Sequence, residues 1–378
     1  MISIIIITSL VILLYFLYPF WLTLIASDIS PDEIEVEEIN SVSVILLSYN
    51  GKQYLNEKIN FLINELSSYK FYELIIIDDH STDGSRELLT TFKFNEHINI
   101  LLNTKHQGIP FSMNLGVTKT KYEYVIFCDQ RQILSKGIVK MIVEPLKYRS
   151  VGAVSGCISV QDKSHKYSFI RMHENYNKIK ENKTGSLIGV YGPFYAIKKC
   201  CYTSIPENII LDDLYLSLKI LKSKKIILME DCQITDDCIS ELYDYNRTKR
   251  YFKGLLQILI DRPLINDLNY KHLCMLICHK YLRLLIPFFI FTCYITIGFK
   301  IFQRIEYEIL FIFLSAIGLL AMLPSRYGFH LNIRNIIRLN LFYFIAIVEV
   351  IISTLLFQNK ASKKNKIAIP ELGNIKTK

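Results

Sequence analysis

The fold is decided by two stretches of sequence, Val42–Asn50 (VSVILLSYN) and Glu73–Ser85 (ELIIIDDHSTDGS). Each begins with a run of β-branched and aliphatic residues and ends in polar residues, which is typical of a buried strand followed by a turn. Similar runs, and segments with apolar residues at helical spacing, surround them. The predicted strands are Val42–Leu47, Leu74–Ile77, Ile98–Leu102 and Tyr124–Phe127, and the predicted helices are Tyr54–Ser67 and Ser85–Phe92. Strands that alternate with helices predict an α/β fold with a mainly parallel sheet and helices on both of its faces.

Polar residues follow the predicted strands at Ser48–Asn50, Asp78–Asp83 and Asp129–Gln132. Parallel sheets bind ligands at the carboxyl ends of their strands, so these residues are candidates for a binding site. A carboxylate there can accept a hydrogen bond from a uracil imide or a ribose hydroxyl, and a turn with glycine lets the backbone approach closely. A structural role is the alternative, in which a Ser, Thr or Asp of Asp78–Ser85 caps the next helix.

The composition indicates a chain that is apolar at both ends and mixed in between. Of 378 residues, 51% are hydrophobic and 21% are charged. Residues 1–27 contain no Asp, Glu, Lys, Arg or His, and the chain after Lys280 is again mostly apolar. This pattern excludes a disordered chain, a collagen-like chain and a small disulfide scaffold, and it argues against a wholly soluble protein. The net charge of +9 comes without a basic-aromatic platform or zinc-finger spacing, so nucleic acid is not an expected partner.

We expect five segments along the chain. Residues 1–27 are long enough for a transmembrane anchor, with a cleaved signal peptide as the alternative. An acidic linker at 28–40, expected to be solvated, leads to a catalytic domain at 41–270, and a Lys-rich tail occupies 358–378. Between them, membrane helices are expected at 271–357, in apolar segments at about 282–302, 309–323 and 339–357. These helices number two or three, because the apolar segment at 339–357 carries Glu349 and lies either across the membrane or along its surface.

The cysteines and the tail bear on localisation. Nine cysteines without a CxxC pair favour a reducing compartment, which places the catalytic domain on the cytoplasmic side. A Lys cluster just after an apolar segment is typical of the cytoplasmic membrane surface. The expected location is therefore the plasma or inner membrane, with membrane lipids as partners.

Further motifs follow in order along the chain. They are Gly108–Gly116 (GIPFSMNLG), Tyr124–Gln132 (YVIFCDQRQ), Gly192–Lys199 (GPFYAIKK), Leu211–Leu218 (LDDLYLSL) and Arg247–Gly254 (RTKRYFKG). With the two opening stretches, this ordered set resembles the motifs of the family 2 glycosyltransferases in their membrane-anchored form. The resemblance covers about residues 40–260 and implies an inverting enzyme with the GT-A fold, which is the fold of nucleotide-diphospho-sugar transferases.

The resemblance implies nucleotide-binding roles for the residues at the strand ends. Tyr49 and Asn50 would lie beside the nucleotide, Asp79 would contact the uracil or ribose, and Asp78 would support it. Asp129 stands where the DxD motif of the family begins, and it would hold the donor diphosphate through Mg²⁺ or Mn²⁺. The implied partners are a nucleotide-sugar donor, in the first place a UDP-sugar, and a lipid-linked or glycan acceptor.

The resemblance also implies a general base. Asp213, with Asp212 beside it, matches the family's TED-like motif. Inverting transfer needs a carboxylate that takes the proton of the acceptor hydroxyl as its oxygen attacks the anomeric carbon. Gly192, Phe194 and Tyr195 fall in a segment that lines the acceptor site in the family. The alternative for the two aspartates is a structural pair at a helix N-terminus, where the helix dipole favours negative charge.

Two positions depart from the family pattern. The DxD position reads Asp129-Gln130-Arg131, so Arg131 would contribute charge to the diphosphate directly, unless it is a solvated surface arginine. The only tryptophan is Trp21, so the QxxRW motif of processive synthases is absent. In its place, Arg247 and Arg250 would hold the diphosphate or, alternatively, meet lipid headgroups. Long-chain processive synthesis is therefore disfavoured.

The sequence as a whole predicts a membrane-bound glycosyltransferase of the hexosyltransferase type, acting in envelope polysaccharide or glycoconjugate synthesis. One alternative is a polyprenyl-phosphate or ceramide-type sugar transferase. Another is a catalytically silent nucleotide-sugar sensor or scaffold on the same fold. The missing second DxD carboxylate supports the sensor, and the Asp212-Asp213 pair argues against it. The histidines show no ligand spacing, and no role is assigned to them.

Overall fold

The computed structural model describes residues 17–26, 33–160, 166–236, 241–282, 345 and 348–351. The chain divides into two compact units. The larger comprises residues 9–240 and 254–283 and contains the whole sheet, while Glu241–Lys253 belongs to the other unit. The expected spans at 282–302, 309–323 and 339–357 lie largely outside the described residues. No helix among the residues described is long and apolar enough to cross a membrane.

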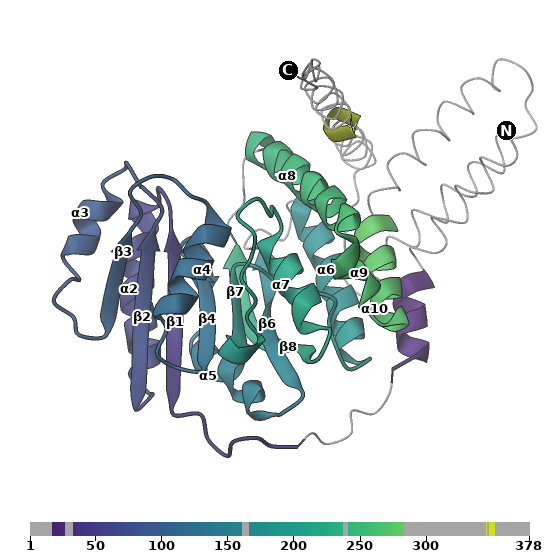
Figure 1. Ribbon diagram of the computed structural model, residues 1–378, viewed down its shortest axis with the longest axis horizontal. Coiled ribbons are helices and arrows are strands. Elements are labelled where there is room, and N and C mark those ends of the chain that lie inside the picture. Colours follow the sequence, from purple (N-terminus) through teal and green to yellow (C-terminus); the bar gives the residue numbers. More distant parts are fainter. Residues whose placement is uncertain are drawn as a thin grey trace, which may run out of the picture. The chain divides into compact units, whose positions relative to one another are not determined.

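Within the described residues, eight strands form one sheet in the order β3-β2-β1-β4-β7-β6-β8-β5 (Figure 1). The strands are β1 (Ser41–Ser48), β2 (Phe71–Asp78), β3 (Ile98–Leu102), β4 (Tyr124–Asp129), β5 (Ile133–Leu134), β6 (Val151–Val160), β7 (Phe194–Lys198) and β8 (Lys225–Asp236). The first four pair in parallel, β7 runs antiparallel between β4 and β6, and the short β5 pairs antiparallel with β8. The expectation of an α/β fold with a mainly parallel sheet is confirmed, and all four predicted strands are present.

Helices connect the strands and cover both faces of the sheet (Figure 1). They are α2 (Lys52–Leu66), α3 (Ser85–Thr90), α4 (Ile109–Lys119), α5 (Ile138–Val143), α6 (Lys166–Asn182) and α7 (Asp212–Ile220). Three further helices follow β8, namely α8 (Glu241–Ile260), α9 (Arg262–Asn266) and α10 (Tyr270–Met275). Short 3-10 turns occur at η1 (Glu144–Lys147) and η2 (Lys199–Cys201), and α10 continues into the π-helical turn η3 (Leu276–Tyr281). Residues 17–24 are also helical.

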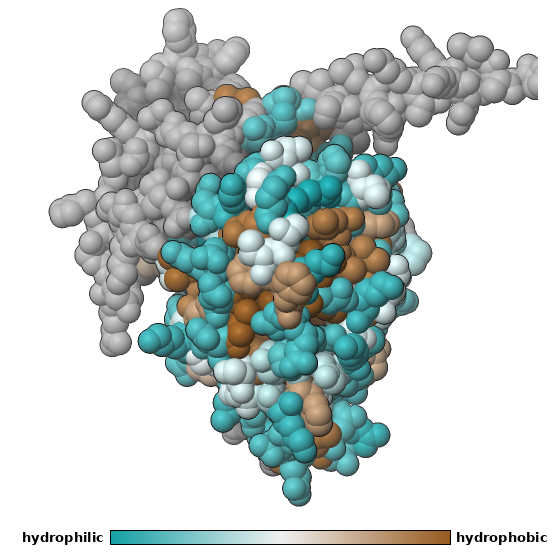
Figure 2. Space-filling view, turned by 90° about the vertical axis from the view of Figure 1, so that its left-hand side faces the viewer, coloured by the Kyte–Doolittle hydropathy of each residue, from teal (hydrophilic) through white to brown (hydrophobic). Residues whose placement is uncertain are grey.

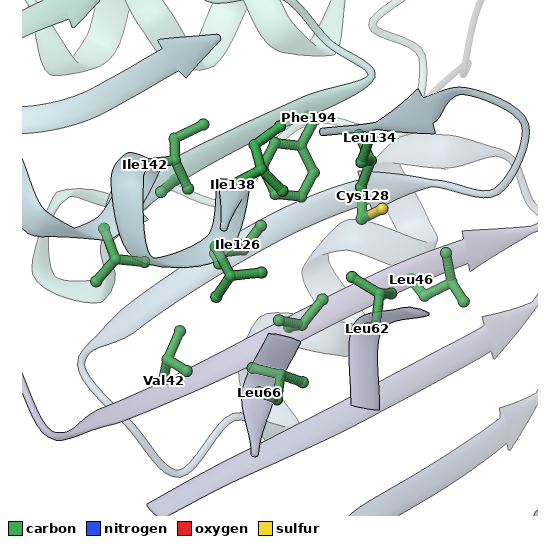
Figure 3. Close-up of a cluster of buried hydrophobic side chains, with 14 of the residues drawn as sticks. Val42, Leu46, Leu62, Leu66, Ile126, Cys128, Leu134, Ile138, Ile142 and Phe194 are labelled. Carbon is green, nitrogen blue, oxygen red and sulfur yellow. The ribbon is translucent and has the colours of Figure 1, made fainter. Parts of the chain in front are cut away.

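The main core lies between the sheet and the two helices α2 and α5. Leu62 and Leu66 of α2 and Ile138 and Ile142 of α5 are fully buried against side chains of β1, β4 and β7 (Figure 3). On the opposite face, α4 packs so closely that a Cβ at Gly116 would lie 2.9 Å from side-chain atoms of the β1 and β2 isoleucines. Burial of one such Leu or Ile side chain contributes about 2 kcal/mol, so this two-sided packing fixes the strands and their ends.

The outer edge of the sheet carries apolar surface. Within the described residues, β3 pairs only with β2, so its other edge is open. Figure 2 views the side of the molecule on which β3 and α3 lie and shows apolar surface gathered on that face. Phe71 at the start of β2, Phe94 in the turn after α3 and Leu102 at the end of β3 are exposed.

The described part of the acidic linker is docked on the domain, although the sequence predicts a solvated linker. Glu35 N donates to Lys147 O at 2.7 Å, and Arg149 N donates to Glu33 O at 2.9 Å. Glu35 also forms an ion pair with the buried Lys198. Because Lys198 pairs with Tyr124 at the start of β4, the linker is held at the end of the sheet opposite the strand ends of interest.

Candidate active site

The register of the sheet brings the predicted nucleotide-binding residues together. Ser48 pairs with Asp78, and Leu47 pairs with Asp129, so β1, β2 and β4 end at the same edge of the sheet. Tyr49 and Asn50 follow β1 at this edge, where both are exposed. The predicted grouping of polar residues at the strand ends is therefore present.

Asn50 and the turn after β2 hold each other in place. Asn50 N donates to Ser81 Oγ at 2.9 Å, and Thr82 N donates to Asn50 Oδ1 at 2.8 Å. Asp83 accepts hydrogen bonds from Lys52 N at 2.9 Å and from Ser85 N at 3.0 Å. The structural alternative thus applies to Asp83, which satisfies backbone donors at the starts of α2 and α3.

Asp78 has one occupied and one unoccupied carboxylate oxygen. Its Oδ2 accepts from Arg86 Nε at 2.7 Å and from Ser81 N at 3.0 Å. Its Oδ1 is buried without a hydrogen-bond partner, and so are Ser48 Oγ and Gln130 Oε1. Buried polar atoms are normally satisfied, so acceptors left open at the strand ends indicate that a ligand or water completes this region.

Asp79 is saturated with hydrogen bonds from the loop that follows β3. Its Oδ1 accepts from Asn103 Nδ2 at 2.8 Å and from Gln107 N at 2.8 Å. Its Oδ2 accepts from Gly108 N at 2.7 Å and lies 2.9 Å from His106 Nδ1. Burial alone would raise the pKa of Asp79, but these donors outweigh burial and lower it below its usual value. Asp79 therefore shapes the loop whether or not it also contacts a nucleobase.

Tyr49 and His106 form an exposed aromatic pair above this loop. Their ring centroids are 4.4 Å apart, with 35° between the ring planes. Gln130 Nε2 donates to Tyr49 O at 2.9 Å, which ties the end of β1 to the segment after β4. An exposed aromatic face at the end of a parallel strand is suited to stacking on a planar ring.

Asp129 has a different environment from Asp79. Within the described residues, only main-chain atoms of Asp129 form hydrogen bonds, and its N donates to Pro193 O at 2.9 Å. Burial, opposed by Arg131 and assisted by the negative charges of Asp236 and Asp213, raises the pKa of Asp129 to about 7. Arg131 in turn lies 3.2 Å from the buried Asp236, so the alternative of a solvated surface arginine does not hold.

The residues around Asp129 fit a hard divalent cation. The carboxylates of Asp213 and Asp236 both act electrostatically on Asp129, and oxygen ligands are those preferred by Mg²⁺ and Mn²⁺. In the part of the chain that the structure describes, no group of three or more His, Cys, Asp or Glu residues is arranged to hold a metal alone. A cation bound through Asp129 would therefore share oxygens of a bound diphosphate or of water.

Asp212 and Asp213 occupy the first turn of α7. Asp213 Oδ1 accepts from Leu214 N at 2.7 Å. Its Oδ2 faces Gly192, where an added Cβ would come within 3.1 Å, so glycine leaves room beside this oxygen. The N-terminal position also favours negative charge by the helix dipole, so the structural interpretation of the pair is compatible with the catalytic one.

Tyr195 and Phe194 point to opposite faces of the sheet. Tyr195 is buried without a hydrogen-bond partner for its hydroxyl, and burial followed by the charges of Asp212 and Asp213 raises its pKa well above the usual value. Its hydroxyl is therefore a protonated donor within the electrostatic influence of both carboxylates. Phe194 packs in the core beside Ile138 (Figure 3), so the expectation that its side chain lines the acceptor site is wrong.

Arg247 and Arg250 lie three residues apart on one face of α8, as the sequence predicts. Both belong to the unit that contains Glu241–Lys253, whereas Asp129 and Asp213 belong to the larger unit. Their contact with a diphosphate stays a prediction.

Sequence reasoning missed Asn103, His106 and Asp236. Asn103 and His106 follow the carboxyl end of β3, so the rule that selected the ends of β1, β2 and β4 would have found them. Asp236 ends β8, and its proximity to Arg131 depends on the antiparallel pairing of β5 with β8. The short β5 has no recognisable strand pattern, so the sequence carries no signal for this contact.

Comparisons with known proteins agree with this geometry. The model of the family described as glycosyl transferase family 2 matches residues 43–200. Glycosyltransferase GlyA of Streptococcus pneumoniae is 22% identical over 258 residues, which cover 62% of this chain and 36% of GlyA. The poly-beta-1,6-N-acetyl-D-glucosamine synthase of Staphylococcus aureus is 24% identical over 197 residues, covering 50% of this chain and 47% of the synthase. The match thus spans less than half the length of either relative.

A solved structure supports the fold. The mannosyltransferase PcManGT from Pyrobaculum calidifontis, in complex with GDP-Man and Mn²⁺, superposes with a TM-score of 0.69 at 17% identity. The superposition covers 92% of this chain and 98% of PcManGT. The strand order, the carboxylates at the strand ends and the family match lead to one conclusion: residues 43–200 form a glycosyl transferase family 2 domain, and the sheet has the GT-A fold.

Proposed function

We propose that this protein is a membrane-bound inverting glycosyltransferase that moves a sugar from a nucleotide-sugar donor, in the first place a UDP-sugar, to a lipid-linked or glycan acceptor. The observation that carries the proposal is the pairing of two carboxylates with separate tasks. Asp129 ends β4 with no side-chain hydrogen bond from the described residues, and Asp213 lies in the first turn of α7, where its charge acts on Asp129. The open acceptors at the ends of β1 and β2 lie at the same sheet edge.

Asp213 is the proposed general base. The acceptor hydroxyl gives its proton to Asp213 Oδ2 while its oxygen forms a bond to the anomeric carbon. The bond between that carbon and the diphosphate oxygen breaks in the same step, and the configuration inverts. The space beside Gly192 allows the acceptor to approach this oxygen. The protonated Tyr195 hydroxyl is available to donate a hydrogen bond near both carboxylates.

Arg131 and Asp129 are the proposed binding residues for the leaving diphosphate. Asp236 fixes the Arg131 guanidinium at 3.2 Å, and a fixed cation stabilises charge that develops on a leaving group. Asp129 would hold Mg²⁺ or Mn²⁺, which when bound neutralises diphosphate charge. The complex of PcManGT with Mn²⁺ supports this part of the proposal, since that protein has a similar fold.

The proposed setting is envelope polysaccharide or glycoconjugate synthesis at a membrane, with the catalytic domain in the cytoplasm. The name of the staphylococcal relative, a poly-beta-1,6-N-acetyl-D-glucosamine synthase, supports a glycan product. The uncharged stretch at 1–27 and the apolar segments after residue 280 support the membrane. Apolar segments on both sides of the domain favour a lipid-linked acceptor over a soluble one.

A donor panel tests the proposal. The full chain in detergent, with native membrane lipids added, is incubated with UDP-, GDP- and dTDP-sugars and Mn²⁺ or Mg²⁺. We expect release of nucleoside diphosphate from one donor, and loss of this release in Asp213→Asn. GDP-mannose belongs in the panel because PcManGT binds it. Binding of a donor without release in any acceptor lipid would contradict the transferase proposal and favour a sensor.

A further inference from the structure

Helix α6 carries two charged side chains that are completely buried. Lys178 and Glu181, one helical turn apart, each have 0% of their surface exposed. Buried charges are costly unless they are paired and hydrogen-bonded. The partners of these two residues lie on three other segments of the larger unit, so the pair serves more than the local stability of α6.

The first of these segments is the stretch 188–193, which leads into β7. Lys178 Nζ donates to Gly189 O and lies 4.4 Å from the centroid of the Tyr191 ring. Glu181 Oε2 accepts from Ile188 N at 3.2 Å. Lys178 therefore holds the carbonyl of Gly189, and Glu181 holds the amide of the neighbouring Ile188.

The stretch 188–193 in turn is connected to both aspartates of the candidate site. Val190 N donates to Ser217 Oγ at 3.1 Å, and Ser217 Oγ donates to Asp213 O at 2.6 Å. Gly192 lies against Asp213 Oδ2. The other aspartate is held by its main chain, because the Pro193 carbonyl accepts from Asp129 N at 2.9 Å. A displacement of this stretch would therefore move the proposed base relative to the donor site.

The remaining oxygen of Glu181 holds two segments from the ends of the larger unit. Tyr18 Oη donates to Glu181 Oε1 at 2.5 Å, and His279 Nδ1 lies 2.5 Å from the same oxygen. Burial would raise the pKa of Glu181, but His279 and Lys178 outweigh burial and bring it to about 2, so Glu181 is ionised at neutral pH. His279 lies in the π-helical turn η3, a rare geometry that is frequent at functional sites.

We propose that Lys178 and Glu181 are positioning residues for Asp213. Through the stretch 188–193 they set the placement of the base. Through Tyr18 and His279 they make that placement depend on the segments 17–24 and 276–281. The inference rests on the proposed role of Asp213 as the base. Neither residue touches the reacting groups, so we expect the pair to act on the rate of transfer. Donor binding should change little, because the pairing of β4 with β1 also holds Asp129 at the sheet edge.

The test compares two buried lysines of the same domain. Lys178→Met removes the cation that holds Gly189, and Lys178→Arg restores a cation. Lys198→Met is the matched control, because Lys198 is also buried but pairs with Glu35 at the opposite end of the sheet. Using the donor found by the panel, we expect Lys178→Met to lower kcat by roughly 100-fold, the effect of a misplaced catalytic group. Binding of UDP or GDP with Mn²⁺ should stay within about 2-fold of wild type.

The remaining variants separate positioning from general stability. Lys178→Arg should recover part of kcat, and Tyr18→Phe should lower kcat several-fold without a change in nucleotide binding. Hydrogen exchange should increase at residues 188–193 in Lys178→Met more than at residues 71–79. The proposal is wrong if Lys178→Met lowers kcat and nucleotide binding together, or if it behaves like Lys198→Met. A wild-type chain without transfer activity would defeat the proposed function, and the exchange comparison would still decide whether Lys178 holds this stretch.

Discussion

Two strands, β2 and β4, flank β1 in the sheet. Asp79 directly follows β2 and Asp129 ends β4, yet their carboxylates have opposite environments. Asp79 accepts hydrogen bonds from Asn103, Gln107 and Gly108 and pairs with His106, and its pKa is lowered. Asp129 has no side-chain hydrogen bond from the described residues, and its pKa is raised to about 7. Position at a strand end therefore does not define a role. A carboxylate whose oxygens accept several hydrogen bonds from the protein stabilises the structure of the site. A carboxylate without such donors has oxygens available to bind a ligand.

The largest expected effect is at Asp213, the proposed base, which lies within the electrostatic influence of Asp129. Asp213→Asn removes the proton acceptor, so transfer should fall by about 10³-fold while nucleotide binding stays within about 2-fold. Nucleoside diphosphate release and titration calorimetry measure the two quantities. Asp267→Asn is the control, since Asp267 is an exposed carboxylate paired with Lys222. Equal activity of the two variants would remove Asp213 as the base.

Asp129→Asn should separate binding from stability. Loss of the carboxylate should weaken Mn²⁺-dependent binding of UDP or GDP by at least about 10-fold, because the metal loses its protein ligand. The free energy of unfolding should not fall, because the substitution removes a partly buried charge that has no hydrogen bond to lose. Calorimetry with and without Mn²⁺, together with denaturant unfolding, measures both. A destabilised variant with unchanged binding would place Asp129 in the same class as Asp79.

The sequence predicts those parts of the site that obey a local pattern. The alternation of aliphatic strands with helices gives the sheet, and the strand-end rule gives Asn50, Asp78, Asp79 and Asp129. Sequence-based prediction fails where packing decides which face of the sheet a side chain occupies. Phe194 and Tyr195 are both buried in a strand covered on both faces, so hydrophobicity gives no signal for which one faces the site.

Long-range contacts between charges are also invisible in the sequence. The linker was expected to be solvated because it is acidic, but Glu35 meets Lys198, 163 residues away. Lys178 and Glu181 have the composition of an exposed helix face, yet tertiary contacts with residues 18, 188, 189 and 279 keep them buried. Local propensity cannot predict such partners, because the fold alone brings them together.

Asp79→Asn should have the opposite effect to Asp129→Asn. An asparagine keeps one acceptor oxygen and turns its amide toward donors, so we expect the free energy of unfolding to fall by about 2–3 kcal/mol at pH 7. Because the folded-state pKa of Asp79 lies below the ordinary 3.8, its stabilising contribution is present above that value and is lost as the pH falls through the folded-state pKa. Urea unfolding from neutral to acidic pH should show a steeper acid loss in wild type than in the variant. Parallel curves would mean that the loop hydrogen bonds do not depend on the charge.

The smallest expected effect is that of substituting His106. This experiment tests which hydrogen-bond donors stabilise the Asp79 carboxylate. His106 is the most accessible of the four partners, with 56% of its side chain exposed, and exposed pairs of this kind contribute between about 0 and 1 kcal/mol. His106→Ala should therefore lower the free energy of unfolding by less than about 1 kcal/mol, because Asn103 and the two backbone amides still satisfy the carboxylate. A double-mutant cycle with Asp79→Asn measures the coupling directly, and we expect a value below about 1 kcal/mol. A coupling above about 2 kcal/mol would mean that the histidine, and not the backbone of the loop, is the main partner of Asp79. In that case the contrast with Asp129 would depend on one exposed side chain, and a ligand that displaced His106 would make the two carboxylates alike.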